Sequence, residues 1–149
     1  MKKKTCYLFI ILGITFIIYN LVWYFGWYNP HNILQNNFPE IEKSGVKIYT
    51  DEEGFQYSVA TPDYLMWNGN LSISEPNNEY TLIIWKKPFK DEFDKGIILN
   101  GYKDLNTQIM LKRSDTAEEK EDQSIVENNI NIFHTLFEKA NKVWKLRLE

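Results

Sequence analysis

The sequence predicts an α+β protein with an N-terminal transmembrane helix, an antiparallel sheet of about six strands, and one long C-terminal amphipathic helix packed on that sheet. Three observations lead to this prediction. An uncharged apolar run follows the lysines at positions 2–4. Segments that alternate apolar and polar side chains fill the middle of the chain. Near the C-terminus, apolar residues recur at spacings of three and four.

The first element is long enough to cross a membrane. Tyr7 to Phe25 contains no charged residue and would measure roughly 28 Å as a helix. Four aromatic residues cluster at its far end, where such rings favour the level of the lipid headgroups: Trp23, Tyr24, Trp27 and Tyr28. We therefore expect a cytoplasmic basic tail at 1–6 and a transmembrane signal anchor at 7–28. The positive-inside rule then places the rest of the chain outside the cell.

A cleaved signal peptide is the alternative interpretation of this element. The basic and apolar regions suit one, but no small-x-small cleavage site follows the apolar run. The single cysteine, Cys6, precedes the run, whereas a lipoprotein cysteine would follow it. An uncleaved anchor is therefore favoured.

The remainder divides into a tether and lead-in at 29–45, which is Asn-rich with two prolines, and an extracytoplasmic α+β domain at 46–149. Period-2 patterning predicts six strands: Val46–Thr50, Phe55–Ala60, Leu71–Ser74, Tyr80–Trp85, Gly96–Asn100 and Gln108–Lys112. Tyr80–Trp85 is apolar on both faces and is therefore expected to be a central strand covered on both sides. Three intervening segments are interpreted as a charged loop, a turn and a polar run outside the core: Lys90–Lys95, Gly101–Asn106 and Ser114–Gln123.

The C-terminal helix is the clearest element of the domain. Ser124 and Glu127 have the spacing of a capping box, with a hydroxyl at the N-cap and a carboxylate three residues on. An apolar stripe follows at helical spacing, formed by Val126, Ile130, Phe133, Phe137, Ala140 and Trp144.

One helix covers only one face of such a sheet. The other face carries Ile83, Trp85 and Met110, and the loop residue Trp67 is a fourth candidate. These four side chains are either covered by the lead-in segment and loops or held free for a partner. We select them as candidate partner-binding residues.

Composition restricts the possible partners. All 20 acidic residues but only 14 of the 17 basic ones follow Pro30, so the outer domain carries a net charge of −6. This charge argues against nucleic acid and suits a basic protein partner, although it also serves solubility. The outer domain has no cysteine, which excludes disulfides and thiolate metal sites there. The Asn-, Lys- and Ile-rich composition favours a bacterial cell surface.

The sequence contains no recognisable catalytic motif, and we expect neither an enzyme, a metal site nor a cofactor. His31 and His134 are isolated, which does not make a zinc site. Carboxylates occur in three clusters that are expected to be solvated turns: Asp51–Glu53, Asp91–Asp94 and Glu118–Asp122. A catalytic carboxylate pair and calcium binding remain alternatives for these clusters.

Together with the Lys-rich anchor and the small domain without cysteine, three stretches resemble the TipC-like immunity proteins of Gram-positive bacteria: Leu65–Leu71 (LMWNGNL), Leu82–Lys87 (LIIWKK) and Ala140–Leu146 (ANKVWKL). This resemblance implies a single-pass plasma-membrane protein with its domain outside the cell. It also implies neutralisation, by stoichiometric binding through one sheet face, of a toxin exported by type VII secretion, such as an LXG toxin that degrades lipid II. The family's contact residues match no fixed motif here, so the four candidates rest on the two-faced strand alone. A second hypothesis is an anchored envelope or sensor module that binds lipid, peptidoglycan or a small molecule, and a third is an anchored hydrolase.

Overall fold

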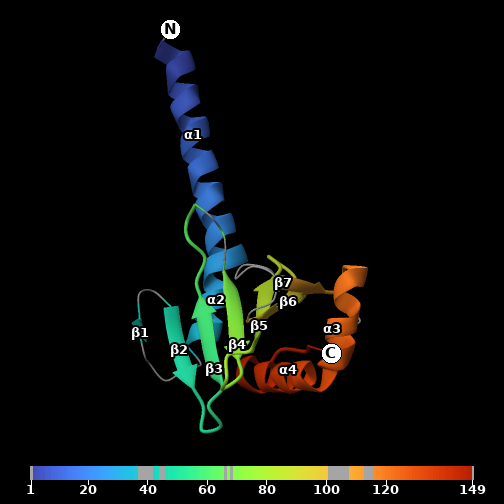
Figure 1. Cartoon of the computed structure of the whole chain (residues 1–149). Helices are drawn as coiled ribbons and strands as arrows, with labels where there is room; N and C mark the ends of the chain where they lie inside the picture. Colours follow the sequence, from blue (N-terminus) through green and yellow to red (C-terminus); the bar gives the residue numbers. More distant parts are fainter. Residues whose placement is uncertain are drawn as a thin grey trace.

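The computed structural model describes residues 2–36, 42–43, 46–65, 67, 69–100, 108–112 and 116–148. They form an N-terminal helix, an antiparallel sheet and C-terminal helices, which is the predicted α+β class. Figure 1 shows the N-terminal helix projecting from the sheet, with the last helix lying at the opposite end of the molecule. The predicted turn at 101–106 lies outside the described residues.

The N-terminal helix is longer than the predicted anchor. It comprises α1 (Lys2–Trp23), a π-helical stretch η1 (Tyr24–Tyr28) and α2 (Asn29–Gln35). Pro30 has no N–H to donate to the preceding turn, and the wider π-helical stretch comes just before it. The start of the expected tether is therefore helical. The continuous segment Cys6–Gln35 is long and apolar enough to cross a membrane, and no residue of its most apolar part is buried.

The sheet contains the six predicted strands and a two-residue edge strand in the lead-in segment. The strands are β1 (Glu42–Lys43), β2 (Val46–Thr50), β3 (Gln56–Ala60), β4 (Asn70–Ser74), β5 (Tyr80–Lys86), β6 (Phe93–Leu99) and β7 (Gln108–Leu111). Each strand pairs antiparallel with the next along the chain, so the sheet is a simple meander. β5 lies between β4 and β6, as its apolar sequence predicts, but the predicted cover on both faces is incomplete, because its buried residues alternate with half-buried ones.

β6 begins earlier than expected. The predicted charged loop ended at Lys95, yet Phe93 to Lys95 already pair with β5. Lys95 is buried, with its ammonium nitrogen 4.7 Å from the centre of the Phe137 ring. A cation–π contact of this kind allows a charged residue to occupy a strand position that a hydropathy pattern assigns to a loop.

The predicted single C-terminal helix is divided into α3 (Gln123–Asn128) and α4 (Ile130–Trp144). Asn129 interrupts it, because its side-chain amide donates to Ile125 O (2.9 Å) while its amide oxygen accepts from the Tyr80 hydroxyl (2.9 Å). Asparagine competes with helical backbone bonding in this way. The predicted capping box is wrong: Asp122 is the N-cap residue of α3, without a side-chain cap, and Ser124 lies inside the helix.

The hydrophobic core lies between α4 and one face of the sheet, which we call the first face. Strand residues of the first face alternate with half-buried residues of the opposite, second face, as β4 and β5 show. The core consists mainly of Tyr57, Val59, Leu71, Ile73, Leu82, Ile84, Ile97, Ile109 and Leu111 of the sheet and Phe133, Leu136, Phe137, Ala140 and Trp144 of α4. Each Val, Leu, Ile or Phe side chain in this core contributes about 1.5–3 kcal/mol on burial. Leu34 of α2 also packs against this core.

The prediction that the polar run Ser114–Gln123 lies outside the core is partly wrong. Ala117 is buried in the core and forms an isolated bridge with Leu111, and Asp122 is also buried. The Gln123 side chain accepts a hydrogen bond from Ala117 N (3.0 Å). This segment therefore contacts the core in spite of its polar composition, because the small apolar side chain of Ala117 packs there.

Candidate functional site

Three of the four candidate residues converge on the second face around Gly96. In the strand register, Gly96 lies opposite Ile83 of β5 and Met110 of β7. A Cβ atom at Gly96 would lie 3.1 Å from Cζ3 of Trp85 and 3.3 Å from Sδ of Met110. The absence of a side chain at Gly96 therefore lets the Trp85 indole lie across the sheet. Ile83, Trp85, Gly96 and Met110 form what we call the Gly96 cluster.

A groove of about 500 Å³ extends from the Gly96 cluster towards the N-terminal helix. Trp85 and Met110 line it on the sheet side, and Trp67 lines it from the β3–β4 loop. Trp27 and His31 contribute from the helix. Trp67, the fourth candidate, thus shares a concave surface with Trp85 and Met110, although it lies 18 residues from Trp85 in the sequence.

Trp67 is held by the N-terminal helix. Its indole nitrogen donates to the Tyr19 hydroxyl (3.0 Å) and to Tyr64 O (3.2 Å). Its ring centre lies 4.3 Å from that of Trp27. Its backbone has φ 54°, in the left-handed region, which a non-glycine residue adopts only when its surroundings compensate. The groove is therefore assembled from the domain and the helix together.

The four aromatic residues at the end of the predicted anchor differ in their surroundings. Trp23 donates to Asp63 O (3.3 Å), and its ring packs against Tyr28 at 5.1 Å and Tyr64 at 5.0 Å. Trp27 contacts Trp67 and Phe89. Tyr24 is 43% exposed. The predicted role of these residues at the membrane interface stays a prediction, while Trp23 and Trp27 have a structural role in contacting the domain.

His31, which was expected in a tether, is instead buried. Its Nδ1 lies 2.7 Å from Trp27 O, and a Cβ atom at Gly69 would lie 2.6 Å from Nε2. Glycine at position 69 is thus what allows the β3–β4 loop to approach the helix. Sequence reasoning missed this contact. The signal that could have revealed it is the four-residue spacing of Trp27 and His31, which places both on one side of a helix.

On β3 to β5 the second face carries paired hydroxyl groups, and Ile48 and Ile98 add apolar side chains to this face. The hydroxyl oxygens of Ser58 and Ser72 lie 2.7 Å apart, and those of Ser74 and Thr81 lie 2.8 Å apart. These pairs satisfy each other across neighbouring strands. The second face therefore combines an aromatic patch at β5–β7 with a polar area at β3–β5, an arrangement typical of protein-binding surfaces.

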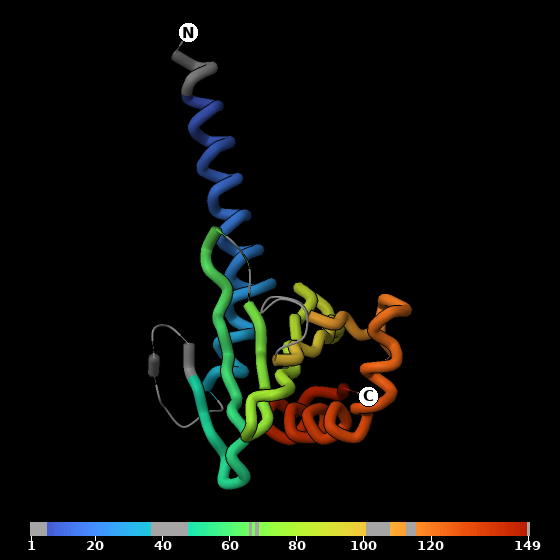
Figure 2. The backbone as a smooth tube through the Cα atoms, in the orientation of Figure 1, coloured from blue at the N-terminus to red at the C-terminus, as the bar shows by residue number. Residues whose placement is uncertain are grey.

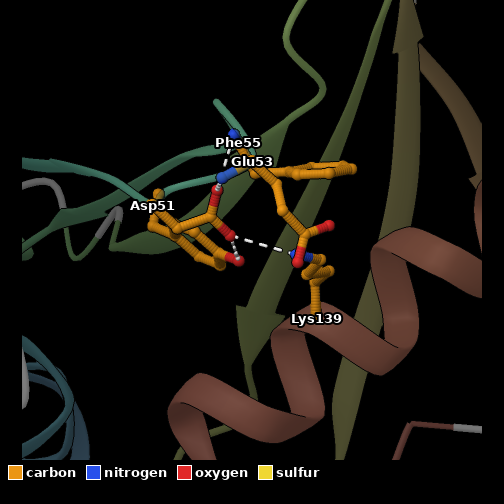
Figure 3. Close-up of polar contacts among 5 residues, drawn as sticks. Asp51, Glu53, Phe55 and Lys139 are labelled. Carbon is orange, nitrogen blue, oxygen red and sulfur yellow. Dashed lines mark hydrogen bonds and ion pairs between the residues drawn. The ribbon is translucent and has the colours of Figure 1, made fainter.

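The acidic turn at 51–53 instead contacts α4, the helix that covers the first face. Asp51 accepts hydrogen bonds from Phe55 N (2.9 Å), the Tyr57 hydroxyl (2.8 Å) and the ammonium of Lys139 on α4 (3.1 Å). Lys139 also pairs with Glu53 at 2.7 Å, as Figure 3 shows. Burial alone would raise the pKa of Asp51, but the hydrogen bonds from Tyr57, Lys139 and Phe55 lower it below its usual value. For Lys139 burial has the opposite effect, and the two carboxylates nevertheless raise its pKa.

The acidic residues around 91–94 are paired with lysines at the surface. Lys87 lies 2.8 Å from Asp94, and Lys86 lies 3.9 Å from Asp91. Within the described part of the chain, no group of three His, Cys, Asp or Glu side chains could share a metal ion.

Comparison with known proteins found no match among family models, curated proteins or solved structures. The resemblance to TipC-like immunity proteins therefore remains a hypothesis based on three short stretches.

Proposed function

We propose that this protein is a membrane-anchored immunity protein that neutralises a secreted antibacterial toxin outside the cell. It acts by binding and not by catalysis, and the second face of the sheet receives the toxin. The observation that carries the proposal is the Gly96 cluster, in which Ile83, Trp85 and Met110 meet on a face opposite the core. Tight protein interfaces commonly centre on such tryptophan-containing apolar patches with a polar surround.

The location outside the cell rests on the N-terminal helix. Its lysines precede the apolar segment and its aromatic residues follow it, a pattern typical of an N-terminus in the cytoplasm. The hydrogen bonds and ring contacts of Tyr19, Trp23 and Trp27 with the domain support an anchor that is retained in the folded protein. Cleavage of the helix as a signal peptide would remove these contacts.

The first test is a capture experiment with the full-length chain in detergent micelles, exposed to the secreted fraction of the source cells. We expect a stable one-to-one complex with one secreted protein that kills cells lacking this chain. Failure to retain any secreted protein, with toxic activity demonstrably present in that fraction, would contradict the proposal.

The second test locates the binding surface. Trp85→Ala should weaken the affinity for the captured toxin at least about 30-fold, the effect of losing a hot-spot residue. Phe55→Ala is the matched control, because Phe55 is a half-buried aromatic that packs against the core of the first face. It should lower stability without changing affinity. Equal affinities of the two variants would show that the second face is not part of the binding interface.

The groove beside the Gly96 cluster favours one alternative, an anchored envelope module that binds a lipid or a small envelope molecule. Its volume of about 500 Å³ and its lining by three tryptophans and Lys86 would suit an amphipathic ligand. Native mass spectrometry of the protein in nanodiscs made from the source cell's lipids tests this. A retained ligand that Trp85→Ala releases, together with no toxin capture, would favour the alternative.

A further inference from the structure

We propose that the β3–β4 loop, at residues 61–65, inserts into the outer leaflet of the membrane alongside α1, with Leu65 in contact with lipid. This inference rests on the membrane anchoring set out under the proposed function. It extends that function by assigning a second membrane contact to the outer domain itself. Figure 2 shows this loop rising beside the N-terminal helix, away from the rest of the sheet.

The loop contacts the helix inside its apolar segment. The Tyr19 hydroxyl donates to Tyr64 O (2.7 Å), and the Tyr64 hydroxyl donates to Asn20 Oδ1 (3.0 Å). At 1.5 Å per residue, Asn20 lies about 24 Å along the helix from Lys4, whereas the hydrocarbon core is about 30 Å thick. With Lys4 at the inner boundary of the hydrocarbon core, Tyr64 therefore reaches about 6 Å below the outer boundary of that core.

At this depth the side chains of Asn20 and Tyr64 and the backbone N–H of Trp67 have partners within the protein. The amide nitrogen of Asn20 donates to Phe16 O (2.7 Å), and its oxygen accepts from Tyr64. Trp67 N donates to Asp63 O at 3.1 Å. Backbone and side-chain polar groups must be satisfied internally in lipid, because no water is present to replace the lost bonds.

Asp63 lies at the headgroup level, where the inserted part of the loop begins. Its backbone oxygen accepts from the Trp23 indole (3.3 Å), and Trp23 lies about 28 Å along the helix from Lys4, close to the headgroup level. The exposed carboxylate of Asp63 can therefore remain in the polar region. Tyr64 and Leu65 follow it towards the hydrocarbon.

The exposed surface of Leu65 is apolar, like the exposed surface of the helix beside the loop. Leu65 is 85% exposed, and the neighbouring Tyr64 packs on Tyr19 at 5.2 Å between ring centres. Phe16 and Leu21 of the helix are themselves 64% and 52% exposed. A single exposed leucine is ordinary on a soluble protein. Here it belongs to a segment packed against a helix whose exposed residues suit lipid, which makes lipid the fitting partner.

Insertion would fix the orientation of the domain. Two contacts with the bilayer, the helix and the loop, restrict rotation of the sheet relative to the membrane. Trp67, just beyond the inserted segment, lines the groove beside the Gly96 cluster. The groove would thus open next to the membrane surface.

Depth-dependent quenching tests the proposal on the full-length chain in phosphatidylcholine nanodiscs. Cys6→Ser provides a cysteine-free background, into which Leu65→Cys is introduced and labelled with an environment-sensitive fluorophore. Phe16→Cys is the control within the helix. Asn77→Cys is the control for exposed loops, because its turn connects the ends of β4 and β5 remote from the helix. The quencher is a nitroxide on the lipid acyl chain.

We expect the label at position 65 to be quenched within a factor of about two of the label at position 16, at a shallower depth, and the label at 77 not to be quenched. Quenching at 16 with none at 65 would overturn the loop insertion and leave the anchor intact. No quenching at either position would overturn both. Because Leu65 is so exposed, its substitution does not disturb the core, and far-UV circular dichroism checks that each labelled protein is folded.

Discussion

The two faces of the sheet come from the same strands but differ in burial and composition. On β5, Ile84 points to the first face and is fully buried against the core, while its neighbour Ile83 points to the second face and is half-buried. The first face is mainly apolar, with Lys95 as a buried charged exception, and is covered by α4. The second face mixes hydroxyl pairs with the Gly96 cluster. The difference indicates that the first face provides stability, and it leaves the second face as the proposed binding surface.

The largest expected effect comes from breaking the first face. Ile84→Ala should lower the free energy of unfolding by about 2–5 kcal/mol, because it leaves a cavity in the core. Ile83→Ala removes the same atoms from the second face and should cost no more than about 1 kcal/mol. Urea unfolding of the full chain in detergent micelles, followed by tryptophan fluorescence, measures both. Equal losses would mean that the second face is also part of the core.

A smaller effect is expected at the ion pair that joins α4 to the β2–β3 turn. Lys139→Met keeps an apolar chain of similar length but removes the ammonium, which pairs with Asp51 and lies 4.5 Å from the centre of the Phe55 ring, and should cost about 1–2 kcal/mol. Glu53→Gln is the control, because the Glu53 side chain is 68% exposed and its pair with Lys139 should contribute less than about 0.5 kcal/mol. The same urea titration compares the two variants. Equal costs would assign the stabilisation to Glu53.

The contribution of Asp51 should depend on pH. Its pKa is lower in the folded state, so the ionised carboxylate stabilises the fold above its unfolded pKa of about 4, and this stabilisation is lost as the pH falls through the folded value. The difference in melting temperature between the natural protein and Asp51→Asn should therefore be constant at neutral pH and shrink below about pH 4. A difference that persists at acidic pH would show that the hydrogen bonds, not the charge, stabilise the turn.

The smallest effect on stability, and the most specific effect on binding, is expected at Gly96. A Cβ atom there meets Trp85 and Met110 at 3.1–3.3 Å, so Gly96→Ala should displace the indole. We expect the free energy of unfolding to change by less than about 1 kcal/mol, and toxin affinity to fall. Ser72→Ala, on the same face, should leave the affinity unchanged. Near-UV circular dichroism and a binding titration distinguish the two variants.

Local patterns predicted the elements well where one physical signal dominated. Alternation located the six strands and the apolar stripe located the core side of α4, because burial of one face requires those periods. The patterns failed where a single side chain overrode them. Asn129 divides the C-terminal helix through bonds to Ile125 and Tyr80, and Lys95 enters the core by lying over Phe137. Neither partner is identifiable from local sequence.

The candidate site shows the same division. Placing Ile83 and Trp85 on one face required only the two-residue period of a strand, and the partition of Met110 from Ile109 and Leu111 followed in the same way. Their convergence required the register that places Gly96 between Ile83 and Met110. The inclusion of Trp67 in a common groove depended on contacts with Tyr19 and Trp27, which lie 48 and 40 residues away.

The sequence by itself determined the apolar N-terminal helix, the α+β class, the positions of the strands and the two-faced character of β5, since each follows from composition or short-range periodicity. Tertiary structure alone decided that the helix and the outer domain form one unit. The hydrogen bonds of Tyr19, Asn20 and Trp23 to the β3–β4 loop join segments some forty residues apart. The physical reason is that side-chain periodicity reports which face of an element is buried, whereas the identity of its partner depends on how the whole chain closes on itself.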